Sequence, residues 1–405
     1  MAKKSKILVI TFSFPTKVNP DAGIFILNQL EYLKKGYDVK VVSPYPFVPS
    51  FKFLSPYHKF AGVKFNEKIN RIEVYRPRYF MLPRNKLTFK FINLILIFEA
   101  LFSFMKSKKV IDNLAKKWGF DIVHVHGLVP DGVIGVKCKK SYSKPLVVTL
   151  HGEDVTKYSK MLFLKSISRF VLARCDKIIC VSKSLKNEVY KTNLSKRNIE
   201  IIPSGYNVGR FKPLDMKKCR RILNLPENKK IVLFVGHLIK RKGVEYLIRA
   251  IKILSEKNNG LLCFIIGKGV LEENLKQIVS ELQLNNRVIF AGKKKPHEIP
   301  IWMNACDVLV LPSLNEGLPN VVSEALACGK PVVATNVAGT PEILNNDVGY
   351  LVNPKDEEDL AKKISKALNK KFNKEKLLKR ANEFSVISSV KKLAKIYKEC
   401  LKQTD

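Results

Sequence analysis

Short apolar runs that alternate with helical patterns restrict the fold of this chain more than any other sequence feature. The first half predicts strands over 6–12, 38–44, 71–77, 121–127, 145–151, 176–182 and 198–205. The second half predicts them over 230–238, 261–269, 287–292, 307–313, 331–336 and 348–354. Many of these runs are continuously apolar, which is typical of parallel strands that helices cover on both faces. We therefore predict an α/β protein with doubly wound parallel sheets.

Chain length divides this pattern into two domains. The 405 residues exceed one ordinary core and fit two domains of about 200 residues each. A turn-rich stretch, SGYNVGRFKP, follows the last strand of the first half. We predict domains over 1–205 and 206–385, and a C-terminal helix over 386–405 that could dock on either domain. Two such domains facing each other would leave a cleft at the carboxyl ends of their strands, where open α/β sheets bind ligands.

The charge of the chain restricts its partners. It has 73 Lys+Arg against 35 Asp+Glu, a formal net charge of +38. Such a field attracts nucleic acid, anionic lipid surfaces or phosphorylated small molecules, although dispersed lysines are also typical of a solvated surface. No nucleic-acid-binding motif accompanies the charge, so we expect no nucleic-acid partner. Eight scattered cysteines without a CxxC pair, and an N-terminus without a signal-peptide pattern, predict a reduced, cytoplasmic protein.

One apolar segment raises the question of a membrane. The run FINLILIFEALFSFM (91–105) is shorter than the roughly 20 residues that a spanning helix needs, so we predict no span. The longer segment 85–117 is apolar in the middle and basic at both ends. It fits a helix lying on the anionic inner face of the cell membrane, and it fits slightly better a buried helix that covers the first sheet.

Two glutamates surround the start of a predicted helix in NEGLPNVVSEALACGK. Pro319 suits the first turn of that helix, and the free backbone amides that follow suit a phosphate group. Glu316 on the preceding loop and Glu324 inside the helix could accept hydrogen bonds from sugar hydroxyls on either side of the phosphate. The arrangement fits a sugar nucleotide. For Glu324 alone, a favourable interaction with the helix dipole, worth about 0.3–1 kcal/mol, would be a sufficient explanation.

A resemblance accompanies this motif. The stretch EGLPNVVSEALACGKPVVAT looks like the signature of retaining GT-B glycosyltransferases of the family-4 type, the group 1 glycosyl transferases. Five further motifs appear in family order: FSFPTKVNPDAGIF (12–25), TLHGEDV (149–155), VSKSLK (181–186), IPSGYNVGRF (202–211) and VGHLIKRKGVEYLIRA (235–250). The resemblance implies two Rossmann-like domains and transfer of a hexose-type sugar from a nucleotide-sugar donor, with retention at the anomeric carbon.

The resemblance also implies roles for residues of the second domain. Glu324 matches the glutamate that holds the donor ribose, and Glu316 matches the one beside the donor sugar and the reacting centre. Lys242 in KRKG matches the lysine that binds the diphosphate. The backbone around Glu316 is implied to approach the donor sugar and phosphate, through Gly317, Leu318, Pro319, Asn320 and Val321.

One position departs from the family pattern. Family members usually carry an arginine two residues after the Val of VGHL, where this chain has His237. His237 could still donate a hydrogen bond to the donor, and the neighbouring Arg241 could replace the missing charge.

In the first domain the resemblance implies a site at the carboxyl ends of the strands. Gly23 would bring its backbone near the donor diphosphate, and His151 would lie near the donor sugar and the acceptor. Asp154, in HGED, and His126 are expected on the acceptor side, with His126 and its neighbour His124 more simply explained as supporting residues.

No Asp-x-Asp pair lies at a strand end, and DEED (356–359) reads as the first turn of a helix. We therefore expect no metal and no other cofactor, because the nucleotide-sugar is a substrate. Front-face attack is the favoured route to retention, and a double displacement through Glu316 is the second.

The expected acceptor is a glycan or a lipid-linked precursor of cell-surface polysaccharide or glycolipid. The alternative is a catalytically weak subunit on the same fold that binds a polyanion or a membrane. Net charge and His237 favour this alternative, while the intact Glu316, Glu324 and Lys242 oppose it. The turns after the first predicted strand and after Val235 both lack G-x-G-x-x-G, which argues against a nicotinamide dehydrogenase.

Overall fold

The structure of the chain is a computed structural model that describes residues 4–47, 62–81, 92–256 and 260–402. Its contacts divide the chain into two compact units. Unit 1 comprises residues 1–204 and 389–405, and unit 2 comprises residues 205–388. Each unit is described by itself below.

Unit 1 is built on an eight-stranded sheet in the order β10-β9-β8-β7-β1-β2-β5-β4, with every pair parallel except β5 and β4. Its strands are β1 (Lys6–Ile10), β2 (Asp38–Val42), β4 (Asn66–Ile69), β5 (Ile72–Tyr75), β7 (Ile122–His126), β8 (Leu146–Leu150), β9 (Lys177–Cys180) and β10 (Ile199–Ile201). A separate parallel pair is formed by β3 (Tyr45–Phe47) and β6 (Arg78–Phe80).

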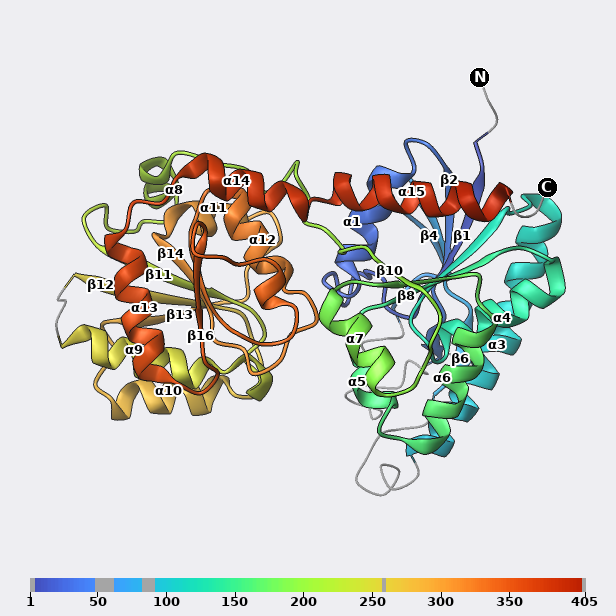
Figure 1. The fold of residues 1–405 in the computed structure, drawn as a ribbon, viewed down its shortest axis with the longest axis horizontal. Coiled ribbons are helices and arrows are strands. Elements are labelled where there is room, and N and C mark those ends of the chain that lie inside the picture. The colour runs from blue at the N-terminus through green and yellow to red at the C-terminus, as the bar shows by residue number, and fades with distance from the viewer. Residues whose placement is uncertain (1–3, 48–61, 82–91, 257–259, 403–405) are drawn as a thin grey trace. The chain divides into compact units, whose positions relative to one another are not determined.

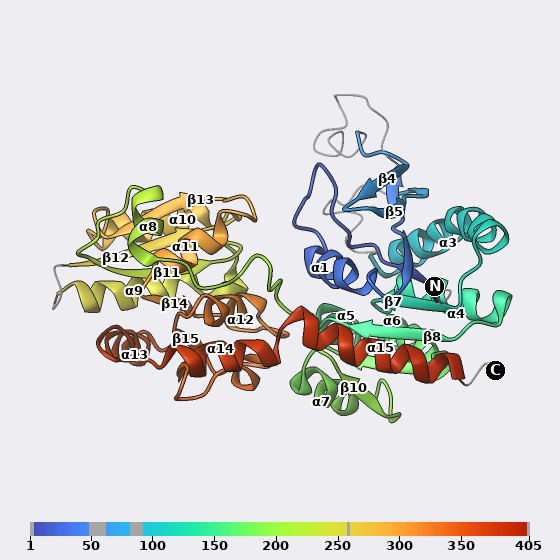
Figure 2. The ribbon, with the colours of Figure 1, turned by 90° about the horizontal axis from the view of Figure 1, so that it is seen from above.

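Helices cover both faces of this sheet (Figure 1). They are α1 (Ile24–Leu33), α3 (Ile92–Lys117), α4 (Asp131–Tyr142), α5 (Glu153–Tyr158), α6 (Leu162–Arg174), α7 (Lys183–Lys191) and α15 (Val386–Lys402). On one face, α1 and the part of α15 after Ser388 bury their apolar side chains against β1, β2 and β7. Figure 2 shows α15 running alongside β7 and β8. On the other face, α4 packs between α3 and α6.

Unit 2 has a six-stranded parallel sheet in the order β13-β12-β11-β14-β15-β16. Its strands are β11 (Lys230–Val235), β12 (Leu261–Ile266), β13 (Val288–Gly292), β14 (Val308–Leu311), β15 (Val332–Thr335) and β16 (Gly349–Val352). Its helices are α8 (Met216–Ile222), η3 (Lys240–Lys242), α9 (Val244–Ser255), α10 (Glu272–Glu281), α11 (Ile299–Ala305), α12 (Asn320–Ala327), η4 (Thr340–Glu342), α13 (Glu357–Asn369) and α14 (Lys374–Glu383). These helices form two groups. In one group, α10 and α13 both pack on α9, and in the other α8, α11, α12 and α14 pack in that order.

Strand composition explains why both sheets are buried. All residues of β7, β8, β12, β14 and β15 are buried, and most of them are Val, Ile or Leu. Branched side chains pack well on a pleated surface, and strands covered on both faces need no polar alternation. The predicted α/β fold with two Rossmann-like parallel-sheet domains is therefore confirmed.

The order of strands locates one switch point in each sheet. In unit 1 the chain leaves β1 toward β2 and later returns to place β7 on the other side of β1. In unit 2 it leaves β11 toward β12 and returns to place β14 beside β11. Loops that follow the two strands at such a point diverge to opposite sides, which opens a crevice at the carboxyl edge of the sheet. FSFPTKVNPDAGIF, KRKG and EGLPN follow β1, β11 and β14 and so lie at these switch points, while HGED and VSKSLK follow the next strands, β8 and β9.

Candidate functional site

The loop after β11 brings KRKG against the loop after β14. Its η3 turn ends at Gly243, which has a left-handed φ of 60° and begins α9. A Cβ at Gly243 would lie 2.2 Å from the carbonyl oxygen of Pro312, the first residue after the neighbouring strand β14. Only glycine meets both conditions, so Gly243 lets the two switch-point loops touch.

The carboxylate of Glu316 is the centre of the contact between these loops. Its Oε1 lies 2.5 Å from Lys242 Nζ and accepts a hydrogen bond of 2.6 Å from Ser313 Oγ. Its Oε2 lies 3.4 Å from Nη1 of Arg241, which also donates to the carbonyl of Asn315. Glu316 is only 8% exposed, and the Lys242 side chain is 13% exposed. Burial strengthens such charge-assisted bonds, so they hold the carboxylate and the lysine in fixed positions.

Helix α12 begins at Asn320, immediately after Pro319, and directs its amino end to the same edge of the sheet. The first amides of a helix have no carbonyl partners inside it, and together with the helix dipole they favour an anion. The loop before the helix is supported by Gly339, where a Cβ would lie 2.1 Å from the Gly317 carbonyl oxygen. Gly317, Leu318, Pro319, Asn320 and Val321 thus form one continuous backbone segment next to Glu316.

Glu324 lies in the second turn of α12, and its side chain is half-buried. Burial raises the pKa of its carboxyl to about 7, against the opposing effect of the positive charge of Arg210. A carboxyl in this state can donate as well as accept a hydrogen bond close to neutral pH. His237, by contrast, is exposed on the turn after β11.

In unit 1 three histidines form a row at the carboxyl ends of β7 and β8. His124 is bonded to Tyr397 Oη at 2.6 Å and to Thr149 Oγ1 at 2.8 Å. His126 Nδ1 lies 3.0 Å from His151 Nε2, and the two rings are stacked. The structure ends β8 at Leu150, so His151 is the first residue of the following loop and not the last residue of the predicted strand.

Burial sets the protonation of this row. It lowers the pKa of His124 to about 3 and that of His151 to about 4, and it lowers the pKa of His126 well below its ordinary value. The charges of the neighbouring histidines add to the effect at His124 and His126. All three rings are therefore neutral at pH 7. His126 Nε2 is buried without a hydrogen-bond partner among the described residues.

Two carboxyl groups lie at the same edge. Asp154 Oδ1 accepts from the amides of Gly152 and Val155 at 2.9 and 3.1 Å, while its Oδ2 is buried without a partner in the described part of the chain. Asp131, the first residue of α4, accepts through Oδ1 from the Phe12 amide at 3.1 Å and so joins the start of this helix to the loop after β1. Burial raises the pKa of Asp154 to about 6 and that of Asp131 well above its usual range.

Gly23 follows the loop after β1 and begins α1 with a left-handed φ of 58°. A Cβ there would lie 1.9 Å from the carbonyl oxygen of Ser13, so no other residue fits without moving the loop. Phe25, in the first turn of α1, packs its ring 4.7 Å from the His151 ring. The structure thus gathers Gly23, His126, His151 and Asp154 at one edge of unit 1. In unit 2 it gathers Lys242, Arg241, Glu316 and the start of α12.

Comparison with known proteins decides the family. The model of glycosyltransferase family 4 matches residues 23–210, and that of glycosyl transferases group 1 matches residues 215–384. The putative teichuronic acid biosynthesis glycosyltransferase TuaC of Bacillus subtilis is 30% identical over 369 residues, which cover 89% of this chain and 88% of TuaC. The chain belongs to the family-4, group 1 glycosyltransferases. It is therefore a retaining enzyme of the GT-B type that uses a nucleotide-sugar donor.

Two further comparisons place this family-4 glycosyltransferase. The UDP-Gal:alpha-D-GlcNAc-diphosphoundecaprenol alpha-1,3-galactosyltransferase of Escherichia coli is 29% identical over 315 residues, 74% of this chain and 80% of that protein. The solved sucrose-phosphate synthase of Thermosynechococcus elongatus has the same fold, with a TM-score of 0.79, 21% identity and coverage of 99% and 100%. None of the helices in the described residues has the length and hydrophobicity that crossing a bilayer requires.

Several residues of the glycosyltransferase escaped the sequence analysis. Ser313 bonds Glu316, Arg210 lies near Glu324, and Asp131 joins the start of α4 to the loop after β1. Ser313 could have been found, because it directly follows a predicted strand at the edge where ligands bind. Arg210 lies inside the motif IPSGYNVGRF, but nothing in the motif points to Glu324 as its neighbour. Asp131 carries no signal, since only the folded chain brings it to Phe12.

Proposed function

We propose that this glycosyltransferase transfers a sugar from a UDP-sugar to a glycan or lipid-linked acceptor during synthesis of a cell-surface polysaccharide or glycolipid. The buried Glu316 carboxylate, fixed by Lys242, Arg241 and Ser313 beside the amino end of α12, carries the proposal. The UDP and the lipid-linked acceptor are suggested by the Escherichia coli relative, whose name specifies both. The polysaccharide is suggested by the name of TuaC.

Unit 2 is proposed to hold the donor. Lys242, Arg241 and the first amides of α12 would take the diphosphate, and the Glu324 carboxyl would take the ribose hydroxyls. Cations and oriented amides at this position stabilise the negative charge that develops on the leaving UDP. His237, which is exposed, is proposed as an additional donor of hydrogen bonds to the diphosphate.

The proposed step is a front-face substitution. The acceptor oxygen forms a bond to the anomeric carbon on the face from which the diphosphate oxygen departs, and the bond between that carbon and the diphosphate oxygen breaks. The acceptor proton passes to the departing diphosphate. Glu316 would stabilise the positive charge on the sugar without bonding to it. Its engagement by two cations and a hydroxyl opposes the second route, in which it would act as a free nucleophile.

Unit 1 is proposed to bind the acceptor. His126 Nε2 and Asp154 Oδ2 are buried polar atoms without partners among the described residues, and such atoms are costly to leave unsatisfied. Hydroxyl groups of a sugar acceptor would satisfy both. Neutral His151, bonded to His126, would present its other nitrogen to the acceptor or to the transferred sugar. Gly23 would bring its amide near the diphosphate.

Helix α3 supports a peripheral position on the inner face of the cell membrane. Four large apolar side chains are 37–55% exposed at the helical spacing i, i+3, i+4, i+7: Phe98, Leu101, Phe102 and Met105. The same side of the helix continues with Lys108, Lys109 and Lys116, and Lys108 forms an ion pair of 3.0 Å with Asp112. Ile95, Ile111 and Leu114 are buried. An apolar stripe followed by lysines fits an anionic bilayer surface. Residues 85–91 of the predicted membrane segment lie outside the described residues.

A transfer assay tests the proposal. Purified enzyme would receive labelled UDP-sugars and either a diphosphoundecaprenol-linked sugar or its water-soluble glycan. We expect transfer to the lipid-linked acceptor without added metal, reduced about 100-fold by Lys242→Ala because a cation on the leaving group is lost. The matched control is Lys240→Ala, since Lys240 lies in the same η3 turn and is exposed. Lipid binding without transfer from any donor would instead favour a catalytically weak membrane-binding subunit.

A further inference from the structure

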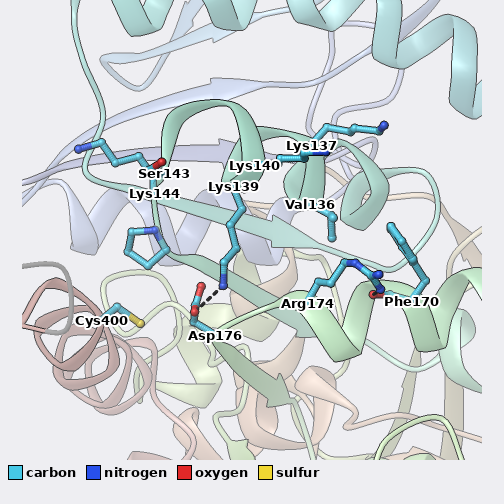
Figure 3. A pocket seen from close by; sticks show the side chains of 11 residues that line it. Val136, Lys137, Lys139, Lys140, Ser143, Lys144, Phe170, Arg174, Asp176 and Cys400 are labelled. Carbon is cyan, nitrogen blue, oxygen red and sulfur yellow. Dashed lines mark hydrogen bonds and ion pairs between the residues drawn. The ribbon is translucent and has the colours of Figure 1, made fainter.

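Unit 1 also has a pocket away from the candidate site, at the edge of the sheet opposite the carboxyl ends of its strands. It occupies about 700 Å³, within the range of small-molecule sites. Pro145 and Asp176 stand just before β8 and β9, so the pocket lies at the amino ends of these strands. The side chains that line it come from α4, α6, α15 and the strand starts: Val136, Lys137, Lys139, Lys140, Ser143, Lys144, Pro145, Phe170, Arg174, Asp176 and Cys400 (Figure 3).

The charges around this pocket do not balance. Its one carboxylate, Asp176, is bonded by Lys139 Nζ at 2.5 Å and by the Leu146 amide at 2.7 Å. The other four cations, Lys137, Lys140, Lys144 and Arg174, have no carboxylate partner in the part of the chain that the structure describes. Four positive groups around one pocket make its electrostatic potential positive, because their contributions add.

Helix dipoles account for only part of this excess. The carboxyl ends of α4 and α6 lie at the pocket, with Lys139, Lys140 and Arg174 in their last turns. Each helix end carries a negative charge of about one half, so the two together offset about one positive charge. Since Lys139 is matched by Asp176, roughly three positive charges remain uncompensated.

One of these cations is held in place. The guanidinium of Arg174 lies 3.8 Å from the centre of the Phe170 ring. Both side chains come from α6 and lie next to each other in Figure 3. Stacking on a ring fixes the plane of the guanidinium. Its Nη1 donates to the Phe170 carbonyl at 3.4 Å, which leaves Nε and Nη2, the two donors on the other edge of the guanidinium, for a two-pronged bond to an oxyanion. The lysines carry their charges on flexible four-carbon stems. Phe170, Val136 and Pro145 add an apolar wall beside the charges.

We propose that this pocket binds a phosphate-bearing anion at a site separate from the one that performs sugar transfer. A phosphate ester or diphosphate carries two or three negative charges, which matches the uncompensated cations, and its oxygens suit the fork of Arg174. The apolar wall provides room for an uncharged portion attached to the phosphate. The same chemistry is found in a soluble phosphate ester and in a lipid headgroup. The proposal depends on neither the donor nor the acceptor of the transferase.

Lysine acetylation followed by mass spectrometry tests the site on the full chain. The two probes are inorganic pyrophosphate and dihexanoyl phosphatidic acid below its micelle concentration, against sodium chloride of equal ionic strength. At ten times the dissociation constant we expect acetylation of Lys140 and Lys144 to slow about tenfold. Lys217 and Lys362, exposed in unit 2, serve as internal controls. Lys242 reports the donor site separately.

Variants complete the test. In Arg174→Gln, about ten times more probe should be needed to protect Lys140 and Lys144 to the same degree, because a charge-assisted pair is lost. Lys137→Gln should weaken it in the same direction, and Lys217→Gln should leave it unchanged. Protection by both probes would identify a soluble phosphate ester, and protection by the lipid alone would identify a headgroup. Equal protection of all exposed lysines, or undiminished protection in Arg174→Gln, would overturn the proposal.

Discussion

Among single residues, Glu324 has a protonation state that folding changes. The pKa of its carboxyl is about 7 in the folded chain, against an ordinary 4.5. Between these values the folded chain keeps a proton that the unfolded chain loses, so this residue makes stability fall as pH rises. The whole effect is at most about 3 kcal/mol, and partial exposure reduces it.

Glu324→Gln should abolish this dependence. We expect the variant to be more stable than the native chain above pH 7 and nearly equal to it below pH 4.5. Urea unfolding followed by Trp302 fluorescence in a Trp118→Phe background reports unit 2 alone, because the chain has two tryptophans, one in each unit. The exposed Glu281, replaced by Gln, serves as the control. A constant stability difference from pH 4 to pH 8 would contradict the assignment.

At the scale of elements, the loops after β14 and β15 depend on a close backbone contact. A methyl group on Gly339 would meet the Gly317 carbonyl oxygen at 2.1 Å, so Gly339→Ala must displace the segment that precedes α12. We expect a loss of about 1–3 kcal/mol in the unfolding free energy and weaker nucleotide binding. Gly36→Ala is the matched control, since nothing lies within 4 Å of a Cβ there. Unchanged nucleotide affinity in Gly339→Ala would remove this loop from the site.

The buried histidines at the ends of β7 and β8 should make the stability of unit 1 depend on pH. His124 and His151 have pKa values of about 3 and 4, below their ordinary 6.5, because burial disfavours the charged ring. In the unfolded chain these two rings bind protons below about pH 6.5, whereas in the folded chain they stay neutral down to about pH 4. Each histidine should therefore lower stability by about 1.4 kcal/mol per unit as the pH falls from 6.5 toward 4. Below about pH 6, Asp131 and Asp154 offset part of this loss, because their raised pKa values act in the opposite direction.

The measurement uses urea unfolding of unit 1 between pH 7.5 and pH 4.5, followed by Trp118 fluorescence in a Trp302→Phe background. His124→Gln should reduce the slope by about 1.4 kcal/mol per pH unit, which is the contribution of one buried histidine, and His237→Gln should leave it unchanged, since His237 is exposed and lies in unit 2. If His124→Gln kept the full slope, the burial argument for this row would be wrong.

For the molecule as a whole, the sequence predicted the α/β class and the strands of both parallel sheets. Their apolar runs are long enough to be recognised. It did not predict β3, β4 or β6, because three or four residues such as NEKI at a sheet edge leave no periodic signal. Segment 85–117 was predicted either to lie on a membrane or to be buried against the sheet. In the described residues of α3, one side of the helix is buried and the other is exposed.

The candidate site was predictable only in part. EGLPN and KRKG are local motifs, but the bond between Glu316 and Lys242 joins residues 74 positions apart, and only the strand order brings them together. The phosphate pocket was not predictable at all. Its lining residues come from α4, α6 and α15, and no motif marks them. The sequence shows a high net charge from lysines spread along the chain, but it does not show that the fold brings several of them together around one pocket.

The central claim is that unit 2 holds a uridine diphosphate between Lys242, the start of α12 and Glu324. The most direct measurement is the thermal shift of the purified protein with UDP, GDP and ADP in the presence of EDTA. We predict stabilisation by UDP alone, about 2.7 kcal/mol at one hundred times its dissociation constant, abolished by Glu324→Ala and retained in Lys240→Ala. Stabilisation that persists in Glu324→Ala, or none with any nucleotide, would contradict the account.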